Sequence, residues 1–330
     1  MAEEKKDPIK ASMDEINKKY GKNSIFVVEK AGDFAIESIP TGCLSLDHVF
    51  ACGGLPRGRI VEVYGPSSSG KSTMAMFLAA QVQKQGGRVV WIDAEYSFST
   101  KYAKNLGVDV NKIILSQPNH AEEALETISA MTKSNSVDLI VLDSVAALVP
   151  EKELDGDISD VNVAQQARLM SKAMRILAGN LSRTKTAVIF INQLRDKIGV
   201  MFGKKQTTPG GNALKFFASV RLEVRKGENI KGDDGDVIGN KIYISAVKNK
   251  VGLPFRKTDL DLYYTKGLDL ESDTFDFGVI REIIIRSGNT YEYGGEKLGV
   301  GKDQCVKALV ANKELFSKLS KELKKDKPST

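Results

Sequence analysis

A run of small and hydroxyl-bearing residues, GPSSSGKST, occupies positions 65–73 and has the composition of a phosphate-binding loop. It fits the pattern G-x-x-x-x-G-K-[ST], in which small residues let backbone N–H groups point at phosphate oxygens. The lysine adds positive charge toward the β- and γ-phosphates, and the following hydroxyl can ligate Mg²⁺. The residues expected to bind phosphate are Gly65, Pro66, Ser67, Ser68, Ser69, Gly70, Lys71, Ser72 and Thr73.

The sequence on either side of this loop supports the same interpretation. A β-branched run, RIVEVYG, precedes it, and the helix-forming run STMAMFLAAQVQK follows it and stops at Gly86 and Gly87. A strand, a glycine loop and a helix in this order place the positive end of the helix dipole at the phosphates. We therefore expect the chain to bind a nucleoside triphosphate together with Mg²⁺.

A second apolar run, VDLIVLDS, ends in Asp143, about seventy residues beyond the loop. An apolar strand that ends in aspartate is common, but after a phosphate-binding loop it predicts a residue of the magnesium site. We expect Asp143 to reach the ion through water or through the Ser72 hydroxyl, so Ser72 and Asp143 form the predicted metal site.

Two further runs end in polar side chains that could act on the γ-phosphate. WIDAEYS ends a strand at Asp93 and Glu95, and carboxyl ends of strands line the ligand crevice of a doubly wound sheet. We expect Glu95 to orient and deprotonate the attacking water; the alternative is a structural carboxylate. The run FINQ places the Gln193 amide where it could sense the γ-phosphate, at the start of a long loop.

That loop, LRDKIGVMFGKKQTTPGGN, combines basic side chains such as Arg195 and Lys197 with apolar ones. Basic and apolar residues on one mobile segment suit a single-stranded nucleic acid groove. An earlier segment, GDISDVNVA, is similarly mixed, and the helix after it carries Arg168, Lys172 and Arg175 on one face. The alternative is an active-site lid beside a solvated helix face.

Composition sets the limits for these expectations. The chain has 330 residues, 42% hydrophobic and 27% charged, with a net charge of +6, which suits one large domain with appendages or two domains. No apolar run approaches the roughly 18 residues of a membrane span. Cys43, Cys52 and Cys305 show no metal spacing, so we expect reduced thiols. His48 and His120 are isolated, and we expect both to be structural or surface residues. We expect a cytoplasmic protein without a membrane partner.

Four continuous apolar runs, RIVEVYG, RVVWIDAE, VDLIVLDS and TAVIFINQ, predict strands buried on both faces of a mostly parallel, twisted α/β sheet. Later runs that alternate, such as SVRLEV, KIYISAVK and TDLDLYY, predict antiparallel extensions. The N-terminal part predicts a helix over residues 8–21 and a strand over 24–28, which form an arm.

Long stretches of the chain resemble the RecA family of homologous recombinases. They include PTGCLSLDHVFACGGLPRGRIVEVYGPSSSGKST, VDLIVLDSVAALVPEKELDGDISD, LAGNLSRTKTAVIFINQLRDKIGVMFG and GGNALKFFASVRLEVRK, and the match runs from about residue 12 to about 325. The resemblance implies an N-terminal polymerisation arm (1–33), a RecA-type P-loop ATPase core (34–268) and a small α/β C-terminal domain (269–330).

The resemblance also implies a helical filament on single-stranded DNA, with ATP between neighbouring subunits. Glu95 then matches the catalytic glutamate and Gln193 the nucleotide sensor. The other residues implied near the nucleotide or the neighbouring subunit are Tyr102, Tyr264, Lys248, Lys250 and Phe216. The implied DNA loops span about 156–164 and 194–209, and the implied DNA contacts are Arg168, Arg175, Arg195, Gly210, Gly211 and Asn212.

By the same resemblance, the chain is expected to be a DNA-dependent ATPase that pairs single-stranded with duplex DNA and exchanges strands in recombinational repair. It is also expected to promote self-cleavage of the SOS repressor. One departure stands out: Ser99 occupies a position where the family often has an aspartate that contacts the nucleoside.

Three other functions share parts of this pattern. A P-loop small-molecule kinase or a GTPase would not need the basic, apolar loop, and no N-K-x-D guanine signature is present. A replicative helicase that forms rings shares the fold, although the arm and VKNK at 247–250 favour a filament. An ATP-gated DNA scaffold without catalysis would follow if the change at Ser99 impairs hydrolysis.

Overall fold

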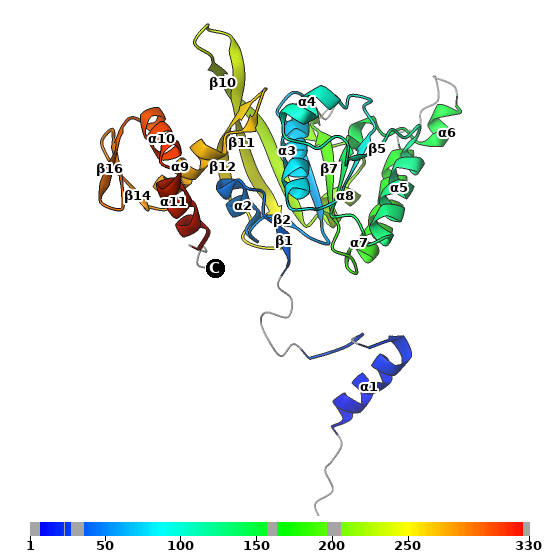
Figure 1. Cartoon of the computed structure of the whole chain (residues 1–330). Coiled ribbons are helices and arrows are strands. Elements are labelled where there is room, and N and C mark those ends of the chain that lie inside the picture. The colour runs from blue at the N-terminus through cyan, green and yellow to red at the C-terminus, as the bar shows by residue number, and fades with distance from the viewer. Residues whose placement is uncertain (1–6, 23, 28–35, 157–163, 197–205, 326–330) are drawn as a thin grey trace, which may run out of the picture. The chain divides into compact units, whose positions relative to one another are not determined.

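The computed structural model describes residues 7–22, 24–27, 36–156, 164–196 and 206–325. The chain divides into two compact units, Met1–Ile36 and Glu37–Thr330. Helix α1 (Pro8–Tyr20) is the principal element of the first unit (Figure 1). It begins where Asp7 accepts a hydrogen bond from the Ile9 N–H, at 3.0 Å, and it buries none of its residues.

The strand expected over residues 24–28 is not present in residues 24–27, and residue 28 lies outside the described residues. Instead, the Asn17 side chain hydrogen-bonds both ways with the backbone of Ile25, at 2.9 and 3.1 Å. A strand needs a neighbour to complete its hydrogen bonds, and the described part of this unit offers none.

The second unit is built on a nine-stranded sheet, which confirms the predicted α/β core. In spatial order its strands are β13 (Gly267–Leu268), β12 (Lys257–Tyr263), β11 (Val237–Asn249), β10 (Val220–Lys231), β3 (Ile60–Gly65), β7 (Ala187–Gln193), β6 (Leu139–Asp143), β4 (Val89–Asp93) and β5 (Ile114–Ser116). Neighbours from β10 to β5 run parallel, and those from β10 to β13 run antiparallel. The four continuous apolar runs are β3, β4, β6 and β7, buried along almost their whole length.

Helices cover both faces of this sheet (Figure 1). Successive strand residues point to opposite sides, and in these strands both sets are apolar, so both faces need covering. On one face, α2 (Leu44–Phe50), α3 (Lys71–Lys84) and α4 (Thr100–Asn105) pack against side chains such as Val61 and Val63. On the other, α5 (Ala121–Lys133), α7 (Gln165–Leu181) and α8 (Ala213–Phe217) pack against Ile60 and Phe190. The shorter elements are β1 (Ser38–Ile39), β2 (Leu55–Pro56), η1 (Val145–Ala147), α6 (Glu151–Leu154), β8 (Arg195–Asp196) and β9 (Gln206–Thr207).

A small α/β domain follows the sheet and has its own core. Its elements are α9 (Leu270–Ile280), β14 (Ile284–Ser287), β15 (Thr290–Tyr293), β16 (Glu296–Val300), α10 (Lys302–Ala311) and α11 (Lys313–Lys325). Phe275 and Tyr291 meet edge to face in this core, with ring centroids 5.0 Å apart, and Leu44 from α2 packs into it. Among the described residues, no helix has the length and apolar character needed to cross a bilayer.

A buried carboxylate joins the small domain to helix α2. Asp273 in α9 is 4% exposed and accepts hydrogen bonds from the Leu44 N–H at 2.7 Å and the Ser45 N–H at 3.3 Å. Burial raises the pKa of Asp273, although these hydrogen bonds oppose the rise. The preceding residue, Cys43, makes no side-chain cap. Asp273 therefore satisfies backbone donors at the start of a helix of the sheet layer.

We expect Asp273→Ala to lower the free energy of unfolding by about 2 kcal/mol, because it leaves two buried N–H groups without an acceptor. Urea unfolding followed by circular dichroism measures this loss. Asp276→Asn, in the same helix, is the matched control: it removes only a partly exposed ion pair with Lys302 and should cost less than about 1 kcal/mol. Equal losses for the two variants would contradict the capping role.

Candidate functional site

The parallel strands bring the predicted site residues to one edge of the sheet. In the register of β3 and β7, Gly65 lies opposite Gln193, and in that of β4 and β6, Asp93 lies opposite Asp143. All four residues therefore end their strands at the same carboxyl edge, where the loops of an open α/β sheet form a ligand crevice.

The loop after β3 has a backbone that depends on its glycines. Gly70 has φ +89° and caps α3, and a Cβ there would lie 2.8 Å from Leu262 Cδ2. A Cβ on Gly65 would lie 2.0 Å from the Val224 carbonyl oxygen. Ser68 also has a positive φ, of 56°. The loop is thus fixed in a tight turn at the N-terminus of a fourteen-residue helix, where backbone N–H groups attract anions.

Two side chains of this loop have the properties expected of phosphate ligands. Lys71 is 7% exposed, and its Nζ donates a 2.6 Å hydrogen bond to the Pro66 carbonyl. Desolvation lowers the pKa of Lys71, while the nearby Asp143 and Glu95 carboxylates oppose the shift. The Ser69 hydroxyl is buried and has no hydrogen-bond partner within the described part of the chain. A phosphate oxygen would satisfy this donor.

Asp143 and Ser72 fit a magnesium ion. Asp143 is 4% exposed, and burial raises its pKa to about 6, with a further rise from Glu95 and a lowering from its hydrogen bond with Ser72. A buried carboxylate of this kind gains from a cation beside it. Mg²⁺ commonly takes only one or two protein ligands and completes its shell with phosphates and water. Among the described residues, no cluster of three or more histidine, cysteine or acidic side chains is present.

The structure distinguishes the two carboxylates at the end of β4, Asp93 in its last position and Glu95 two residues beyond. Glu95 is exposed at the crevice, and its Oε1 accepts hydrogen bonds from Gln193 Nε2 at 2.9 Å and from Ser144 Oγ at 2.5 Å. Asp93 is fully buried and accepts three 3.0 Å hydrogen bonds, from the Ser97 and Phe98 N–H groups and from a glutamine amide. Asp93 therefore shapes the turn, whereas Glu95 stays exposed beyond the end of the strand.

Ser144 was not predicted as a site residue, although it directly follows Asp143 at the same strand end.

The two tyrosines expected near the nucleotide lie on different elements. The Tyr102 hydroxyl lies 3.0 Å from Thr73 Oγ1, next to the phosphate loop. Ser99 caps α4 by accepting the Tyr102 N–H at 3.2 Å. Tyr264 is exposed after β12, and its hydroxyl lies 3.3 Å from Asn240 Oδ1.

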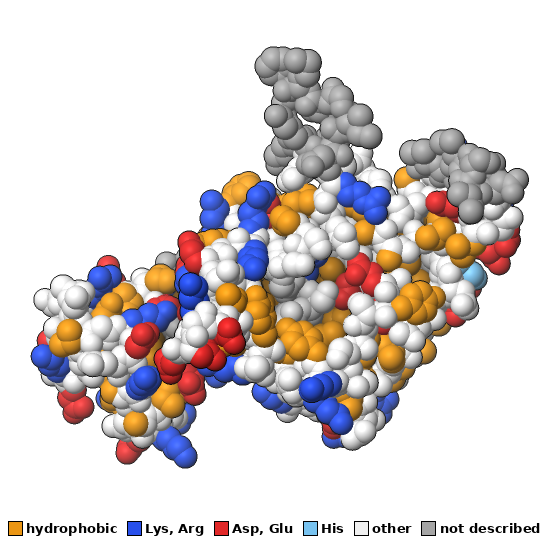
Figure 2. Space-filling model, turned by 90° about the horizontal axis from the view of Figure 1, so that it is seen from above, with side chains coloured by type: hydrophobic (Ala, Val, Ile, Leu, Met, Phe, Trp, Pro, Cys, Tyr) orange, Lys and Arg blue, Asp and Glu red, His pale blue; other side chains and the backbone are white. Residues whose placement is uncertain are grey.

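The basic residues expected to bind DNA lie on exposed surface where the structure describes them. Arg168, Lys172 and Arg175 are exposed along α7, while its opposite face is buried in the core. Arg195 is exposed in β8, and Lys197 lies outside the described residues. On the face seen in Figure 2, Lys and Arg side chains form separate groups with acidic and apolar side chains between them.

The glycines expected at the DNA site pack closely against α7 and η1. Gly210 and Gly211 have φ values of +83° and +76°. A Cβ on the first would lie 2.9 Å from Val145 Cγ1, and a Cβ on the second would lie 2.9 Å from Ala167 Cβ. Any larger residue would push this segment off the helix layer. Asn212 follows as the N-cap position of α8.

Lys248, Lys250 and Phe216 form one cluster at the other end of α8. Lys248 Nζ donates to the carbonyls of Lys215 and Phe216, at 2.6 and 2.8 Å, and Lys250 Nζ donates to the latter at 3.3 Å. The Phe216 side chain is 71% exposed. Desolvation, with the charges of Lys250 and Arg221, lowers the pKa of Lys248 to about 8.

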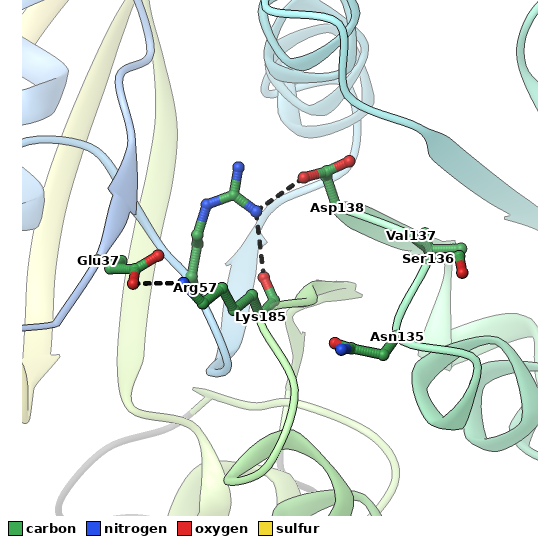
Figure 3. Close-up of a pocket in the computed structure, with 7 residues that line it drawn as sticks. All are labelled: Glu37, Arg57, Asn135, Ser136, Val137, Asp138 and Lys185. Carbon is green, nitrogen blue, oxygen red and sulfur yellow. Dashed lines mark hydrogen bonds and ion pairs between the residues drawn. The ribbon is translucent and has the colours of Figure 1, made fainter.

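A cavity of about 420 Å³ lies at the opposite end of the parallel strands, before β6 and β7 (Figure 3). Its two cationic side chains are already paired: Arg57 with Asp138 at 2.8 Å, and Lys185 with Glu37 at 2.5 Å. Because these charges neutralise one another and lie away from the carboxyl edge, the cavity is not part of the nucleotide site.

Comparisons with known proteins cover almost the whole chain. The family model described as the RecA N-terminal domain matches residues 7–269, and that of the RecA C-terminal domain matches 272–327. Protein RecA of Lactobacillus acidophilus is 45% identical over 322 residues, covering 98% of this chain and 88% of the relative. Those of Mycoplasma mycoides and Bacillus subtilis are 48% and 47% identical, covering 96% and 95% of this chain and 92% and 90% of the relatives.

Among solved structures, the RadB recombinase aligns with a TM-score of 0.53 and 20% identity, over 70% of this chain and 98% of that one. At this identity the alignment is a likeness of fold.

We expect Asp143→Asn to raise the free energy of unfolding at pH 7.5 without nucleotide, by up to about 3 kcal/mol. The folded-state pKa of Asp143 is about 6 and its usual value is 3.8. Its ionisation therefore destabilises the fold increasingly as the pH rises between these two values, and fully above the higher one. The gain should shrink between about pH 6 and pH 4 and vanish below. Urea unfolding across this range measures it, with Asp93→Asn as a control that should destabilise. A variant no more stable than the original chain at pH 7.5 would refute the electrostatic account.

Proposed function

The chain belongs to the RecA family, whose members are recombinases of homologous recombination, and from this premise we propose that it is a DNA-dependent ATPase that forms filaments on single-stranded DNA. The observation that carries the proposal is the position of Gln193. Its amide donates to Glu95 at the ATP site, and its strand leads directly into the segment with Arg195. One residue thus connects the nucleotide site with the DNA segment.

In the proposed ATP site, the loop Gly65–Thr73 and the N-terminus of α3 bind the phosphates, with Lys71 and the unpaired Ser69 hydroxyl as further donors. Ser72 and Asp143 would hold Mg²⁺, which when bound offsets the charge that develops on the phosphate oxygens. Tyr102, beside Thr73, is placed to stack on the base. The Ser99 hydroxyl, which caps α4 by accepting the Tyr102 N–H, links the position of Tyr102 to the start of this helix.

Glu95 is the proposed general base. Its Oε1 accepts hydrogen bonds from Gln193 and Ser144, and Ser144 would keep the carboxylate oriented toward the attacking water once Gln193 turns to the γ-phosphate. When the γ-phosphate is present, the Gln193 amide can exchange Glu95 for a phosphate oxygen. This exchange would move the segment that follows β7 and so alter the grip on DNA.

Assembly completes the proposed site. Lys248 and Lys250, now bound to α8 carbonyls, would reach the triphosphate of the neighbouring subunit and stabilise charge in the transition state. Phe216, exposed at the same end of α8, is the proposed interface residue. Arg168, Lys172, Arg175, Arg195, Lys197 and the segment Gly210–Asn212 would hold the DNA backbone, while base pairing with a duplex reads the sequence.

Family membership supports two further proposals: the filament promotes self-cleavage of the SOS repressor, and it acts in the cytoplasm.

Single-stranded DNA should raise ATP hydrolysis at least about tenfold, and this stimulation should fade between about 50 mM and about 200 mM salt, because the DNA contacts are ionic. A coupled assay of ADP release measures both effects. Lys71→Ala provides the blank, and Glu95→Gln should lose about a hundredfold or more while still binding ATP. Hydrolysis that is indifferent to DNA would overturn the proposed function.

The DNA-stimulated rate at limiting ATP should fall as the pH rises above about 8, since Lys248, whose pKa in the separate chain is about 8, must first take up a proton to bind the neighbour's triphosphate. Lys248→Arg stays protonated and should remove this alkaline limb when each profile is scaled to its own maximum. Lys250→Arg is the matched control and should keep the limb. A limb unchanged by Lys248→Arg would show that another group titrates.

A further inference from the structure

A fully buried glutamate lies on the sheet face beneath α8. Glu62 in β3 has no exposed surface, and its Oε2 pairs with Arg221 Nε of β10 at 2.5 Å. The Arg221 guanidinium also lies over the Tyr64 ring, 4.5 Å from its centroid. A charge this deep is tolerated only where partners satisfy it, and an apolar residue in its place would be the simpler solution for a core. Glu62 therefore points to a role beyond packing.

The second partner of Glu62 is the buried amide of Asn192. Asn192 Nδ2 donates to Glu62 Oε1 and to the Pro209 carbonyl, both at 3.2 Å, and Oδ1 accepts the Gln193 N–H at 3.0 Å. Both amide protons and the amide oxygen are thus engaged, and the residue has no exposed surface. Because an ionised Glu62 can only accept hydrogen bonds, it fixes the Asn192 side chain with its NH2 group, rather than its oxygen, toward Pro209.

These contacts hold one segment at both of its ends. Pro209 precedes Gly210 and Gly211, and Asn192 binds its carbonyl. The other end is the C-terminus of α8, whose carbonyls Lys248 holds. Lys248 lies opposite Arg221 in the register of β10 and β11, so one polar cluster on the sheet face contacts the segment 209–217 at its start and its end.

We propose that Glu62 is a positioning residue. By fixing the Asn192 amide on the Pro209 carbonyl, it couples DNA binding at the adjacent segment Gly210–Asn212 to ATP hydrolysis. The inference rests on the proposed DNA-dependent ATPase. Any shift of Pro209 away from this contact leaves a buried amide proton without an acceptor, so the amide favours one defined position of the segment. Asn192 also accepts from the backbone of Gln193, whose side chain holds Glu95, and the shift therefore reaches the catalytic carboxylate.

The test compares variants of Asn192 and Glu62 in the full-length chain. Asn192→Asp places a second carboxylate against Glu62 and the Pro209 carbonyl, and Asn192→Ala removes the donor without adding charge. Glu62→Gln keeps the shape but offers one acceptor oxygen to two donors, Arg221 Nε and Asn192 Nδ2, and so tests Glu62 itself. ATP hydrolysis is measured without DNA and over a titration of single-stranded DNA, and urea unfolding tests whether each variant is folded.

Both Asn192 variants should lose at least about fivefold of the maximal DNA stimulation. Their DNA-free rate and the DNA concentration for half-maximal stimulation should each stay within about twofold of the original chain, and Glu62→Gln should also lose stimulation, because its single acceptor oxygen cannot serve both donors. If the original chain itself shows no stimulation, the proposed function fails. If that chain is stimulated, the coupling role is overturned by unchanged stimulation in the variants, by equal losses with and without DNA, or by a change confined to the half-maximal concentration. Should Asn192→Asp fail to fold, Asn192→Ala decides by the same criteria.

Discussion

The register of the parallel strands is the constraint on which the site depends. Gly65 lies beside Gln193 and Asp93 beside Asp143 only because four buried strands start and end together. A slip of one residue would turn each of these side chains to the other face of the sheet. The apolar runs that fill both faces prevent that slip, since it would exchange the side chains packed against α3 for those packed against α7.

The same burial sets the electrostatics of the site. Lys71, Asp143 and Glu62 are nearly or fully buried, and each depends on a few named partners rather than on water. In such surroundings the loss or gain of one charge acts strongly on its neighbours. This explains why burial raises the pKa of Asp143 and lowers that of Lys71.

The sequence predicted the core strands, the phosphate loop and the residues at the strand ends, because continuous apolar runs and the G-x-x-x-x-G-K-[ST] pattern have local causes. The contacts of Ser144, Asn192 and Glu62 arise from strand order, which no local pattern contains. The expected strand at 24–28 was wrong over residues 24–27 because strand propensity needs a partner. The assigned roles in phosphate and magnesium binding, in catalysis and in DNA binding stay predictions.

The capping of α2 by Asp273 bears on how the chain can be divided. The two family models meet between residues 269 and 272, which invites treatment of the C-terminal part as a detachable module. A chain cut at that junction would lose the acceptor for two backbone donors of α2, and Leu44 would lose the apolar core into which it packs. Two separate family matches therefore do not imply two parts that fold independently. The part of the chain before residue 269 owes some of its stability to residues that come after it.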